Sequence, residues 1–501
     1  MVLLSLVAPA AVIAALLVIF GLVYALWILG TLACVVILLA FIAWLWLRCT
    51  LPSRKQGSLA FFHPFADSGG GGERVLWCAV KALQDAYPSL QILIYCKAGL
   101  TPMTLCLRAS SAFFLDVQDS FQVVPLTHCD LISPKRYPRW TMLQQALGSV
   151  QLAYDALALA VPEVVIDTSG WAFMYPLFRL AGVRVASYTH YPTISTDMLQ
   201  RVTSRQATFN NNSKIAADPL KSLAKVVYYF IFAAAYGAVG GWANVVMVNS
   251  SWTRQHISQL WWTLSKPSLV YPPCNVSHLA ALPLDRKLKS LFLVSVAQFR
   301  PEKDHEKQLH AFSLARERAH ADTQRTSSLS SEAVLAARLK LVGSCRNGED
   351  EQRVANLKKT TSELGLDAHV DFCVNAPFSE VQQLLGGAVG GLHTMIDEHF
   401  GISIVEYMAA GVIPIAHNSG GPMMDILVKD SSGMVGYLCE SKEEYADAIT
   451  EVLSMDQEKR MSIAAAARRR ALCFTDKGFQ EAFLECLEAG VLPSNLHRRT
   501  L

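Results

Sequence analysis

The sequence predicts an α/β protein in which two Rossmann-like domains face each other across a cleft, preceded by an N-terminal transmembrane helical segment. Three observations lead to this fold class. Residues 1–47 carry no charged side chain, β-rich runs alternate with segments of helical periodicity from about residue 59, and this alternation stops near residues 271–283 and begins again. Such alternation is typical of βαβ units and parallel sheets.

The composition narrows the class of protein. A chain of 501 residues is long enough for roughly two to three domains. Apolar residues make up 52% of it and the mean hydropathy is +0.28, so part of the chain is expected to meet lipid. The net charge of +3 and the absence of a dense Lys/Arg stripe give no sign of nucleic-acid binding. The twelve cysteines lack the spacing of a zinc site or a disulfide framework, which favours a reducing, cytosol-facing environment.

Residues 1–50 are expected to form a membrane anchor. One helical span needs about 20 apolar residues, so the uncharged run over residues 1–47 is long enough for two. Either a helical hairpin turns near Gly21, or one span carries an extra embedded portion. A cleaved signal peptide does not fit, because the run has no basic start and is too long. The positive charges that follow it, beginning with Arg48, indicate that the rest of the chain is cytosolic.

A second uncharged stretch runs from Val226 to Val248. We expect a buried helix and then a buried strand, with Gly240 and Gly241 between them, in preference to a full membrane span. Contact of the helical part with a membrane surface stays open.

The first domain is expected over residues 58–285. Its helix over Glu73–Tyr87 has five apolar residues on one face, which are Val75, Leu76, Ala79, Val80 and Leu83. Its strands are expected at Leu59–His63, Leu90–Cys96, Phe121–Leu126, Glu163–Asp167, Val183–His190 and Asn244–Val248.

The second domain is expected over residues 286–472, and residues 473–501 are expected to form a helix that packs back on the first domain. A loop is expected over Ala321–Ser331. The strands are expected at Leu291–Val296, Ala337–Gly343, Val370–Cys373, Gly390–His393 and Val412–Ala416. Because ligands bind outside the carboxyl ends of the strands in open α/β sheets, two facing sheets suit a transfer between two substrates.

The segment from His393 to Gly411 carries the most informative pattern. A strand is expected to end at its start, and a helix to begin at Gly401. Free N–H groups at that helix start would attract a diphosphate. Glu398 and Glu406 are separated by seven residues, one before the helix and one inside it, where they could accept hydrogen bonds from sugar and ribose hydroxyls. Each alone is more simply an ordinary surface glutamate, and the pair at this spacing favours function.

Cations follow the first strand of the second domain, in the loop Gln298–Lys303. Arg300 and Lys303 could neutralise the charge on a leaving nucleotide diphosphate. The alternative is that both are solvated cations, as most Lys and Arg residues are.

Two glycine-rich loops and one histidine complete the candidates. In residues 417–422, Gly420 and Gly421 would let the backbone approach a phosphate, although a plain turn explains them as well. His190 ends a strand of the first domain and would face the cleft. Residues 66–74 fit neither the P-loop nor the dinucleotide fingerprint, and their glycines would admit an acceptor or a phosphate, with turn flexibility as the competing explanation; these glycines are Gly69, Gly70, Gly71 and Gly72.

Together these motifs resemble glycosyltransferase family four, whose members have the GT-B fold and an E-x7-E signature, matched here by Glu398 and Glu406. Within it, the chain looks like the eukaryotic enzymes that transfer mannose from GDP-mannose to dolichol-linked oligosaccharide in alpha-1,2 linkage. The similarity runs from about Leu59 to beyond Tyr437, and its motifs are FFHPFADSGGGGERVLWCAV, HYPTISTDML, VVMVNSSWT, YPPCNV, QFRPEKDH and AHNSGGP.

The resemblance implies a retaining transferase that adds the fourth and fifth mannoses to the lipid-linked precursor of N-glycans, on the cytosolic face of the endoplasmic reticulum membrane. It implies no metal and no cofactor, and other mannosyltransferases of the dolichol pathway as partners. It also implies the site roles. Glu398 would contact the donor sugar and Glu406 the ribose. The backbone at Phe400, Gly401 and Ile402 would hold the diphosphate, Arg300 and Lys303 would assist its departure, and His190 and the glycine loop at 69–72 would order the acceptor.

One position departs from the family. Many members have an arginine five residues before the matched Lys303, where this chain has Gln298, so whether Gln298 or Arg300 faces the diphosphate stays open. Two other functions stay open as well: another lipid-directed enzyme of the same family, and a catalytically silent membrane scaffold.

Overall fold

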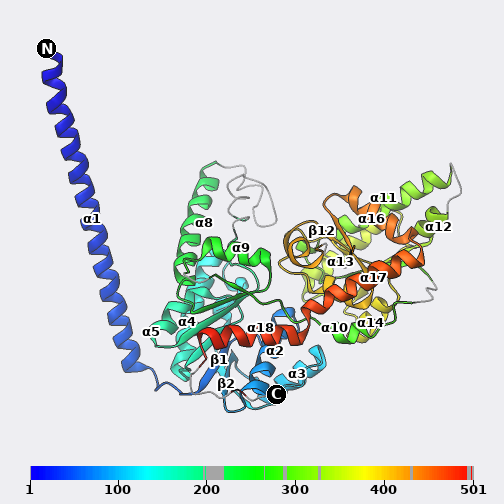
Figure 1. Ribbon diagram of the computed structural model, residues 1–501, viewed down its shortest axis with the longest axis horizontal. Coiled ribbons are helices and arrows are strands. Elements are labelled where there is room, and N and C mark those ends of the chain that lie inside the picture. Colours follow the sequence, from blue (N-terminus) through cyan, green and yellow to red (C-terminus); the bar gives the residue numbers. More distant parts are fainter. Residues whose placement is uncertain are drawn as a thin grey trace.

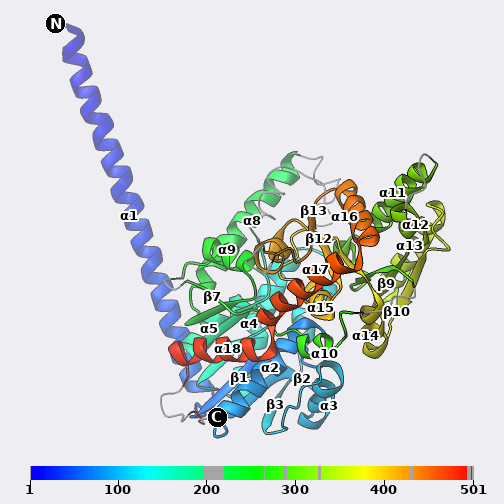
Figure 2. The ribbon, with the colours of Figure 1, turned by 45° about the vertical axis from the view of Figure 1, so that its right-hand side comes forward.

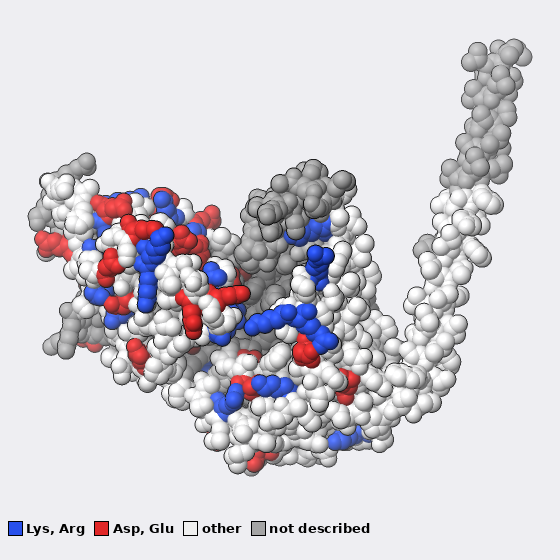
Figure 3. All heavy atoms as spheres, turned by 180° about the vertical axis from the view of Figure 1, so that it is seen from behind, with Lys and Arg blue, Asp and Glu red and all other residues white. Residues whose placement is uncertain are grey.

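The computed structural model describes residues 2–195, 198, 219–263, 266–285, 290–324, 329–428, 433–492 and 498. One long helix stands beside two α/β domains (Figure 1). The molecular surface is hollowed between the two domains (Figure 3).

The N-terminal helix, α1 (Val2–Thr50), is continuous over 49 residues. At 1.5 Å per residue it is about 70 Å long, more than twice the thickness of a bilayer's hydrocarbon core, about 30 Å. Its last turns lie on the first domain, where Leu47 is buried and the Trp46 ring stacks on Tyr154 at 5.1 Å. By length and composition, residues 19–50 of α1 could cross a membrane.

The first domain is a seven-stranded parallel sheet in the order β3-β2-β1-β4-β5-β6-β7. Its strands are buried apolar runs, as expected where helices cover both faces of a parallel sheet. The strands are β1 (Ser58–Phe62), β2 (Gln91–Lys97), β3 (Phe121–Leu126), β4 (Val164–Asp167), β5 (Arg184–Thr189), β6 (Val245–Val248) and β7 (Ser268–Leu269). The helices are α2 (Gly71–Ala86), α3 (Pro102–Phe113), α4 (Thr141–Leu159), α5 (Tyr175–Leu180), α8 (Pro219–Gly240) and α9 (Ser251–Leu260).

The second domain is a six-stranded parallel sheet in the order β10-β9-β8-β11-β12-β13, with one hydrophobic core on each face. Its strands are β8 (Phe292–Val296), β9 (Arg338–Gly343), β10 (Val370–Val374), β11 (Gly390–His393), β12 (Ile413–His417) and β13 (Tyr437–Cys439). Its helices are α10 (Val276–Ala280), α11 (His305–Thr323), α12 (Leu329–Ala336), α13 (Gly348–Glu363), α14 (Phe378–Gly387), α15 (Ile402–Ala410), α16 (Lys442–Ser454) and α17 (Gln457–Ala471).

Each sheet has one point where the strand order reverses. This point lies between β1 and β4 in the first sheet and between β8 and β11 in the second. Ligands of doubly wound sheets bind outside the carboxyl ends of the strands at that point. His63 and Thr168 follow β1 and β4, while the loop 297–304 and Thr394 follow β8 and β11.

The chain crosses between the domains twice, and the two crossings are bonded to each other. Cys274 N donates to Phe474 O at 3.1 Å, and Cys274 pairs with Thr475 in an isolated parallel bridge. After the second crossing, α18 (Asp476–Gly490) packs on α2 and β6 of the first domain (Figures 1 and 2). Its apolar residues, which include Phe483 and Leu487, belong to the core of that domain.

The eleven strands predicted from the sequence are confirmed, each within one residue of its expected ends. The two strands that the sequence analysis missed, β7 and β13, are only two and three residues long. Such short strands are too brief to show an alternating pattern.

Three expectations about helices need correction. The hairpin near Gly21 is wrong, because α1 runs straight through this glycine. The stretch from Val226 to Val248 does form a helix and then a strand, but the helix is buried along one side only. The loop expected over residues 321–331 is helical at both ends, in α11 and α12, and residues 325–328 lie outside the described part of the chain.

Candidate active site

Three side chains from three segments meet on the second-domain side of the cleft. Lys303 lies at the end of a short 3-10 turn after β8, His393 ends β11, and Glu398 lies in the loop between β11 and α15. The Lys303 Nζ atom is 2.5 Å from Glu398 Oε2, and His393 Nε2 is 3.0 Å from the same oxygen. Lys303 and Glu398 were predicted from the sequence as candidate site residues, and the fold brings them into direct contact.

The charges in this cluster determine the protonation state of Glu398. Burial alone would raise the pKa of Glu398, but the Lys303 cation and the hydrogen bond with His393 hold it well below its ordinary value. Burial lowers the pKa of His393. Glu398 is therefore a carboxylate at neutral pH, able to accept hydrogen bonds but not to donate a proton.

The loop after Glu398 leads into the start of α15. Gly401 is the N-cap, with φ at +110°, a conformation that favours glycine. No side chain of the described residues caps this helix, so its first N–H groups are free to bind a diphosphate. Phe400 is buried and Ile402 is half-buried at this helix start. Glu406 lies one turn further on, and burial raises its pKa to about 7, against the nearby Arg74 cation.

The glycines of the loop after β12 pack against this donor loop. A Cβ at Gly420 would lie 2.3 Å from Glu398 O, and one at Gly421 would lie 2.6 Å from the Phe400 Cα. Gly421 N also donates to Glu398 O at 2.8 Å. Both glycines therefore let two loops meet closely beside Glu398 and Phe400.

The glycine loop of the first domain reaches the same helix start from across the cleft. A Cβ at Gly71 would lie 2.7 Å from Ile402 Cδ1, and one at Gly72 would lie 3.6 Å from His190 Nε2. Gly70 N donates to Glu73 Oε2 at 2.7 Å, which caps α2. Nothing lies within 4 Å of a Cβ at Gly69.

A polar chain supports this loop. Glu73 Oε1 is 3.2 Å from His63 Nε2, and His63 Nδ1 is 2.7 Å from Thr168 Oγ1. His63 follows β1 and Thr168 follows β4, so these hydrogen-bonded side chains bridge the reversal point of the first sheet.

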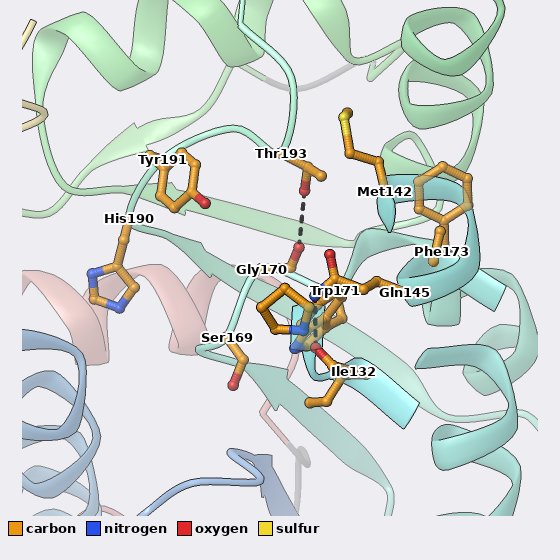
Figure 4. A pocket seen from close by; sticks show the side chains of 12 residues that line it. Ile132, Met142, Gln145, Ser169, Gly170, Trp171, Phe173, His190, Tyr191 and Thr193 are labelled. Carbon is orange, nitrogen blue, oxygen red and sulfur yellow. Dashed lines mark hydrogen bonds between the residues drawn. The ribbon is translucent and has the colours of Figure 1, made fainter. Parts of the chain in front are cut away.

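His190 lies beside a pocket of about 350 Å³ in the first domain. The pocket is lined by α4 and by the loops after β4 and β5, with His190 at one side and Met142 and Phe173 at the other (Figure 4). Burial lowers the pKa of His190 to about 4, with a smaller effect of His63 in the same direction, so its imidazole is neutral at pH 7.

An aromatic contact joins the two domains next to Glu398. The ring of His399, on the second domain, stacks on Tyr191 of the first domain at 4.8 Å between centroids. Trp252 of the first domain lies 5.2 Å from the same ring. The segment that carries Glu398 and Phe400 is therefore held directly by the first domain.

Arg300 is placed differently from Lys303. Its Nη1 atom lies 3.6 Å from Glu302 Oε1 on the same turn, and among the described residues it is not one of the groups bonded to Glu398. No group of three or more His, Cys, Asp or Glu side chains in the described residues could hold a metal ion.

The sequence analysis did not propose roles for His63, His393, Tyr191 or His399. Two of these carried a usable signal: His63 follows β1 and His393 ends β11, the same kind of position that singled out His190. The stacking of Tyr191 on His399 had no signal, because it depends on how the two domains meet.

The fold is that of GT-B glycosyltransferases. Sucrose-phosphate synthase from Thermosynechococcus elongatus is similar over 86% of this chain and 98% of its own, with a TM-score of 0.60 and 15% identity. Anabaena HepE, solved in complex with UDP, is similar over 86% of this chain and 99% of its own, with a TM-score of 0.57 and 17% identity. These likenesses show that the chain has the GT-B fold. The match of its second domain to the family model "Glycosyl transferases group 1" shows that the chain is a GT-B glycosyltransferase.

Residues 56–261 match the family model "ALG11 mannosyltransferase N-terminus", and residues 283–470 match "Glycosyl transferases group 1". The Homo sapiens protein named GDP-Man:Man(3)GlcNAc(2)-PP-Dol alpha-1,2-mannosyltransferase is 41% identical over 93% of this chain and 96% of its own length. The Caenorhabditis elegans protein of that name is 39% identical over 85% of this chain and 90% of its own. The chain belongs to this mannosyltransferase family.

Proposed function

We propose that the chain transfers mannose from GDP-mannose to a dolichol-diphosphate-linked oligosaccharide, forming alpha-1,2 linkages with retention of configuration. The relatives' names supply the donor, the acceptor and the linkage. The acceptor would be Man3GlcNAc2-diphosphate-dolichol, to which the fourth and fifth mannoses are added in turn. The reaction would need no metal and no cofactor.

One observation carries the proposal. The glycine loop that begins α2 meets the uncapped start of α15, with Gly71 directly against Ile402. This contact joins the reversal points of the two sheets, with the Lys303–Glu398 pair on one side and His190 on the other. A donor phosphate at α15 and an acceptor hydroxyl near His190 would then be neighbours.

The chemistry proposed for this site is a front-face displacement. The bond from the mannose C1 to the diphosphate oxygen breaks, a bond from C1 to the acceptor oxygen forms on the same face, and the acceptor proton passes to the departing diphosphate. The negative charge that develops on GDP is the main quantity to be stabilised. Lys303 and the free N–H groups of α15 supply fixed positive charge there.

The remaining residues orient the two substrates. Glu398, ionised at neutral pH, would accept hydrogen bonds from hydroxyls of the donor sugar. His190, neutral at the same pH, would help to order the acceptor. Glu406 would bind the ribose, and Arg300 would add positive charge beyond Lys303.

The cellular setting is part of the proposal. The two domains would lie on the cytosolic face of the endoplasmic reticulum membrane, held there by α1, because that is where a dolichol-linked Man3GlcNAc2 acceptor and GDP-mannose meet. Other mannosyltransferases of the same pathway would be partners.

The test uses the purified full chain in detergent with a Man3GlcNAc2-diphosphate-lipid acceptor. GDP-mannose should add one and then two hexoses to the acceptor, an alpha-1,2-mannosidase should remove both, and excess EDTA should leave the rate unchanged. UDP-glucose should give no product.

Other outcomes decide between the alternatives. Transfer from a UDP-sugar instead of GDP-mannose would favour another lipid-directed transferase. No transfer from either donor, together with retained binding to partner mannosyltransferases, would favour a silent scaffold.

A further inference from the structure

A run of hydrogen bonds joins the glycine loop of the first domain to His190. The Glu73 carboxylate accepts from Gly70 N at 2.7 Å through Oε2, and its Oε1 atom is 3.2 Å from His63 Nε2. His63 Nδ1 is 2.7 Å from Thr168 Oγ1. A hydrogen bond joins the backbone of Thr168 to the His190 ring. The side chains of Glu73, His63 and Thr168, together with His190, therefore form one polar network.

The middle of this polar network is shielded from water. His63 is 5% exposed and Thr168 is 1% exposed, while the side chain of Glu73 is 14% exposed. In such surroundings a hydrogen bond is strong and a group without a partner is costly. Each member therefore has few other arrangements open to it, and the network fixes the relative positions of the segments that it joins.

The hydrogen bonds lead to the Glu73 carboxylate. Burial alone would raise the pKa of Glu73, but the hydrogen bond with His63 and the one from Gly70 N hold it below its ordinary value. A carboxylate can only accept, so His63 donates to it through Nε2. In a neutral imidazole the other nitrogen accepts, and the Thr168 hydroxyl is then the donor to His63 Nδ1.

At the other end of the network, His190 has a ring nitrogen that the fold does not use. Its Nε2 atom is buried and has no hydrogen-bond partner among the described residues. This nitrogen faces the glycine loop, since a Cβ at Gly72 would lie 3.6 Å from it. Buried polar atoms are nearly always paired. An unpaired one between the glycine loop and the pocket that His190 lines therefore indicates a place for a group of the substrate.

One carboxylate holds both sides of the gap between the glycine loop and His190. Through Oε2, Glu73 fixes the start of α2, to which Gly72 belongs. Through Oε1 it holds His63 and, beyond it, Thr168, whose backbone bonds the ring of His190. A break at any point of the network would let the two sides of the gap move relative to each other.

We propose that Glu73, His63 and Thr168 are positioning residues of the transfer reaction, which hold the glycine loop and His190 at the spacing that the acceptor requires. They act through His190 and the loop and not by contact with a substrate. This proposal rests on the proposed function for the nature of the reaction. The coupling of the loop to His190 requires only the fold.

The first kinetic test compares two substitutions at Thr168. Thr168→Val removes the hydroxyl and should lower kcat about tenfold, because a shift of about 1 Å between catalytic parts is costly. The KM for GDP-mannose should stay almost unchanged, because the donor binds to the second domain. Thr168→Ser keeps the hydroxyl and should retain most of the rate.

Thr361→Val is the matched control for Thr168→Val. Thr361 is also buried, and its hydroxyl donates to Leu357 O at 2.8 Å within α13 of the second domain. Its loss should change neither kcat nor KM. Equal losses of kcat for valine and serine at position 168, or no loss for valine, would contradict the proposal.

The second kinetic test changes the carboxylate. Glu73→Gln replaces one accepting oxygen by an NH2 group, so the side chain can no longer accept from both Gly70 N and His63. We expect kcat to fall about tenfold. Glu163→Gln is the control, because Glu163 Oε2 also accepts from a glycine N–H, that of Gly57 at 2.8 Å, at the amino ends of β1 and β4. A Glu73 variant as fast as the Glu163 variant would contradict the proposal.

Hydrogen exchange of the full chain in detergent tests the coupling without any need for activity. In Thr168→Val, amide exchange should become about threefold faster or more in peptides covering residues 68–74 and 188–192, because local opening becomes easier on both sides of the gap. Peptides covering β9 of the second domain should not change. Faster exchange confined to the loop that carries residue 168 would overturn the coupling.

These measurements separate the two proposals. If the unchanged chain transfers no mannose, the proposed function fails, and hydrogen exchange still decides whether the network couples the glycine loop to His190. If the unchanged chain is active and the Thr168→Val and Glu73→Gln variants match its kcat, the proposed function stands and the positioning role fails.

Discussion

Lys303 and Glu398 are the residues on which the proposed chemistry depends most. Lys303 Nζ is 2.5 Å from Glu398 Oε2, and His393 Nε2 lies 3.0 Å from the same oxygen. The ion pair keeps Glu398 ionised and holds a cation on the loop that leads into the uncapped start of α15.

We expect Lys303→Ala to lower kcat by about 100- to 1,000-fold, because it removes fixed positive charge from the developing diphosphate, and to change donor affinity much less. Lys307→Ala is the matched control, since Lys307 lies on the next helix, α11, where its ammonium group donates to Glu440 O at 2.9 Å and lies over the Tyr445 ring. The measurement is steady-state kinetics with GDP-mannose and lipid acceptor. Unchanged kcat in the Lys303 variant would remove it from the catalytic residues.

The contribution of Glu406 to stability depends on pH with the opposite sign to that of Glu398. Its pKa in the folded chain is about 7, so between its ordinary value and pH 7 the folded state holds a proton that the unfolded state has lost. Stability from this group is therefore full at low pH and falls as pH rises toward 7.

We expect Glu406→Gln to raise the melting temperature above pH 7 and to have no effect near pH 4.5, in thermal denaturation of the full chain in detergent. Glu398→Gln should do the reverse and lower the melting temperature at neutral pH, since the pKa of Glu398 is depressed. A Glu406 variant whose melting temperature tracks that of the unchanged chain at every pH would show that its carboxylate is not buried as described.

At the scale of elements, the start of α2 and the start of α15 act as one unit. Gly71 is the first residue of α2, where alanine would suit the helix, so any cost of a methyl group there comes from Ile402.

We expect Gly71→Ala to lower kcat/KM by about tenfold, because even a shift of about 1 Å between catalytic parts is costly, and to leave the melting temperature almost unchanged. Gly69→Ala should have no effect, because nothing lies within 4 Å of the added carbon. In a chain that already carries Ile402→Ala, adding Gly71→Ala should lower kcat/KM much less than tenfold. A double variant as slow as Gly71→Ala would rule out the steric contact as the cause.

The elements were largely predictable from the sequence and the contacts between them were not. Buried apolar runs located the strands, because each run has the length and composition of a strand. On that basis the sequence placed Glu398 and Lys303 in loops that follow strands. β7 and β13 were missed because two or three residues carry no period. The turn near Gly21 failed because an isolated glycine in an apolar run is tolerated within a helix.

Of the candidate site, only the residues that follow individual strands were predictable from the sequence. That Gly420 and Gly421 pack on the Glu398 loop depends on the close approach of two loops. That their backbone also approaches a phosphate stays a prediction. Whether Arg300 takes part stays a prediction, since its nearest ionic partner is Glu302.

At the scale of the whole molecule, Arg74 joins both crossings between the domains. It is buried, its Nε donates to Pro273 O at 3.1 Å, and its Nη2 donates to both carboxylate oxygens of Asp476 at 2.8 Å. One guanidinium therefore ties the two crossings to α2 of the first domain.

We expect Arg74→Ala to lower the free energy of unfolding by about 2–4 kcal/mol, somewhat less than for a fully buried pair because Asp476 is partly exposed. Lys359→Ala, which breaks an exposed pair with Glu363, should cost less than about 1 kcal/mol. Denaturant unfolding in detergent measures both. A loss no larger for Arg74 than for Lys359 would mean that the crossings hold without it.

The return of α18 to the first domain sets the order in which the chain can mature. Multidomain chains usually complete their N-terminal domain first during synthesis. Here Phe483 and Leu487, from near the end of the chain, complete the core of the domain that is translated first. With roughly 220 residues still to be made after β7, at about 5–20 residues per second, that core stays open for on the order of 10–40 s on the ribosome. A premature stop codon shortly after residue 475 would therefore leave the second domain complete and remove part of the core of the first domain.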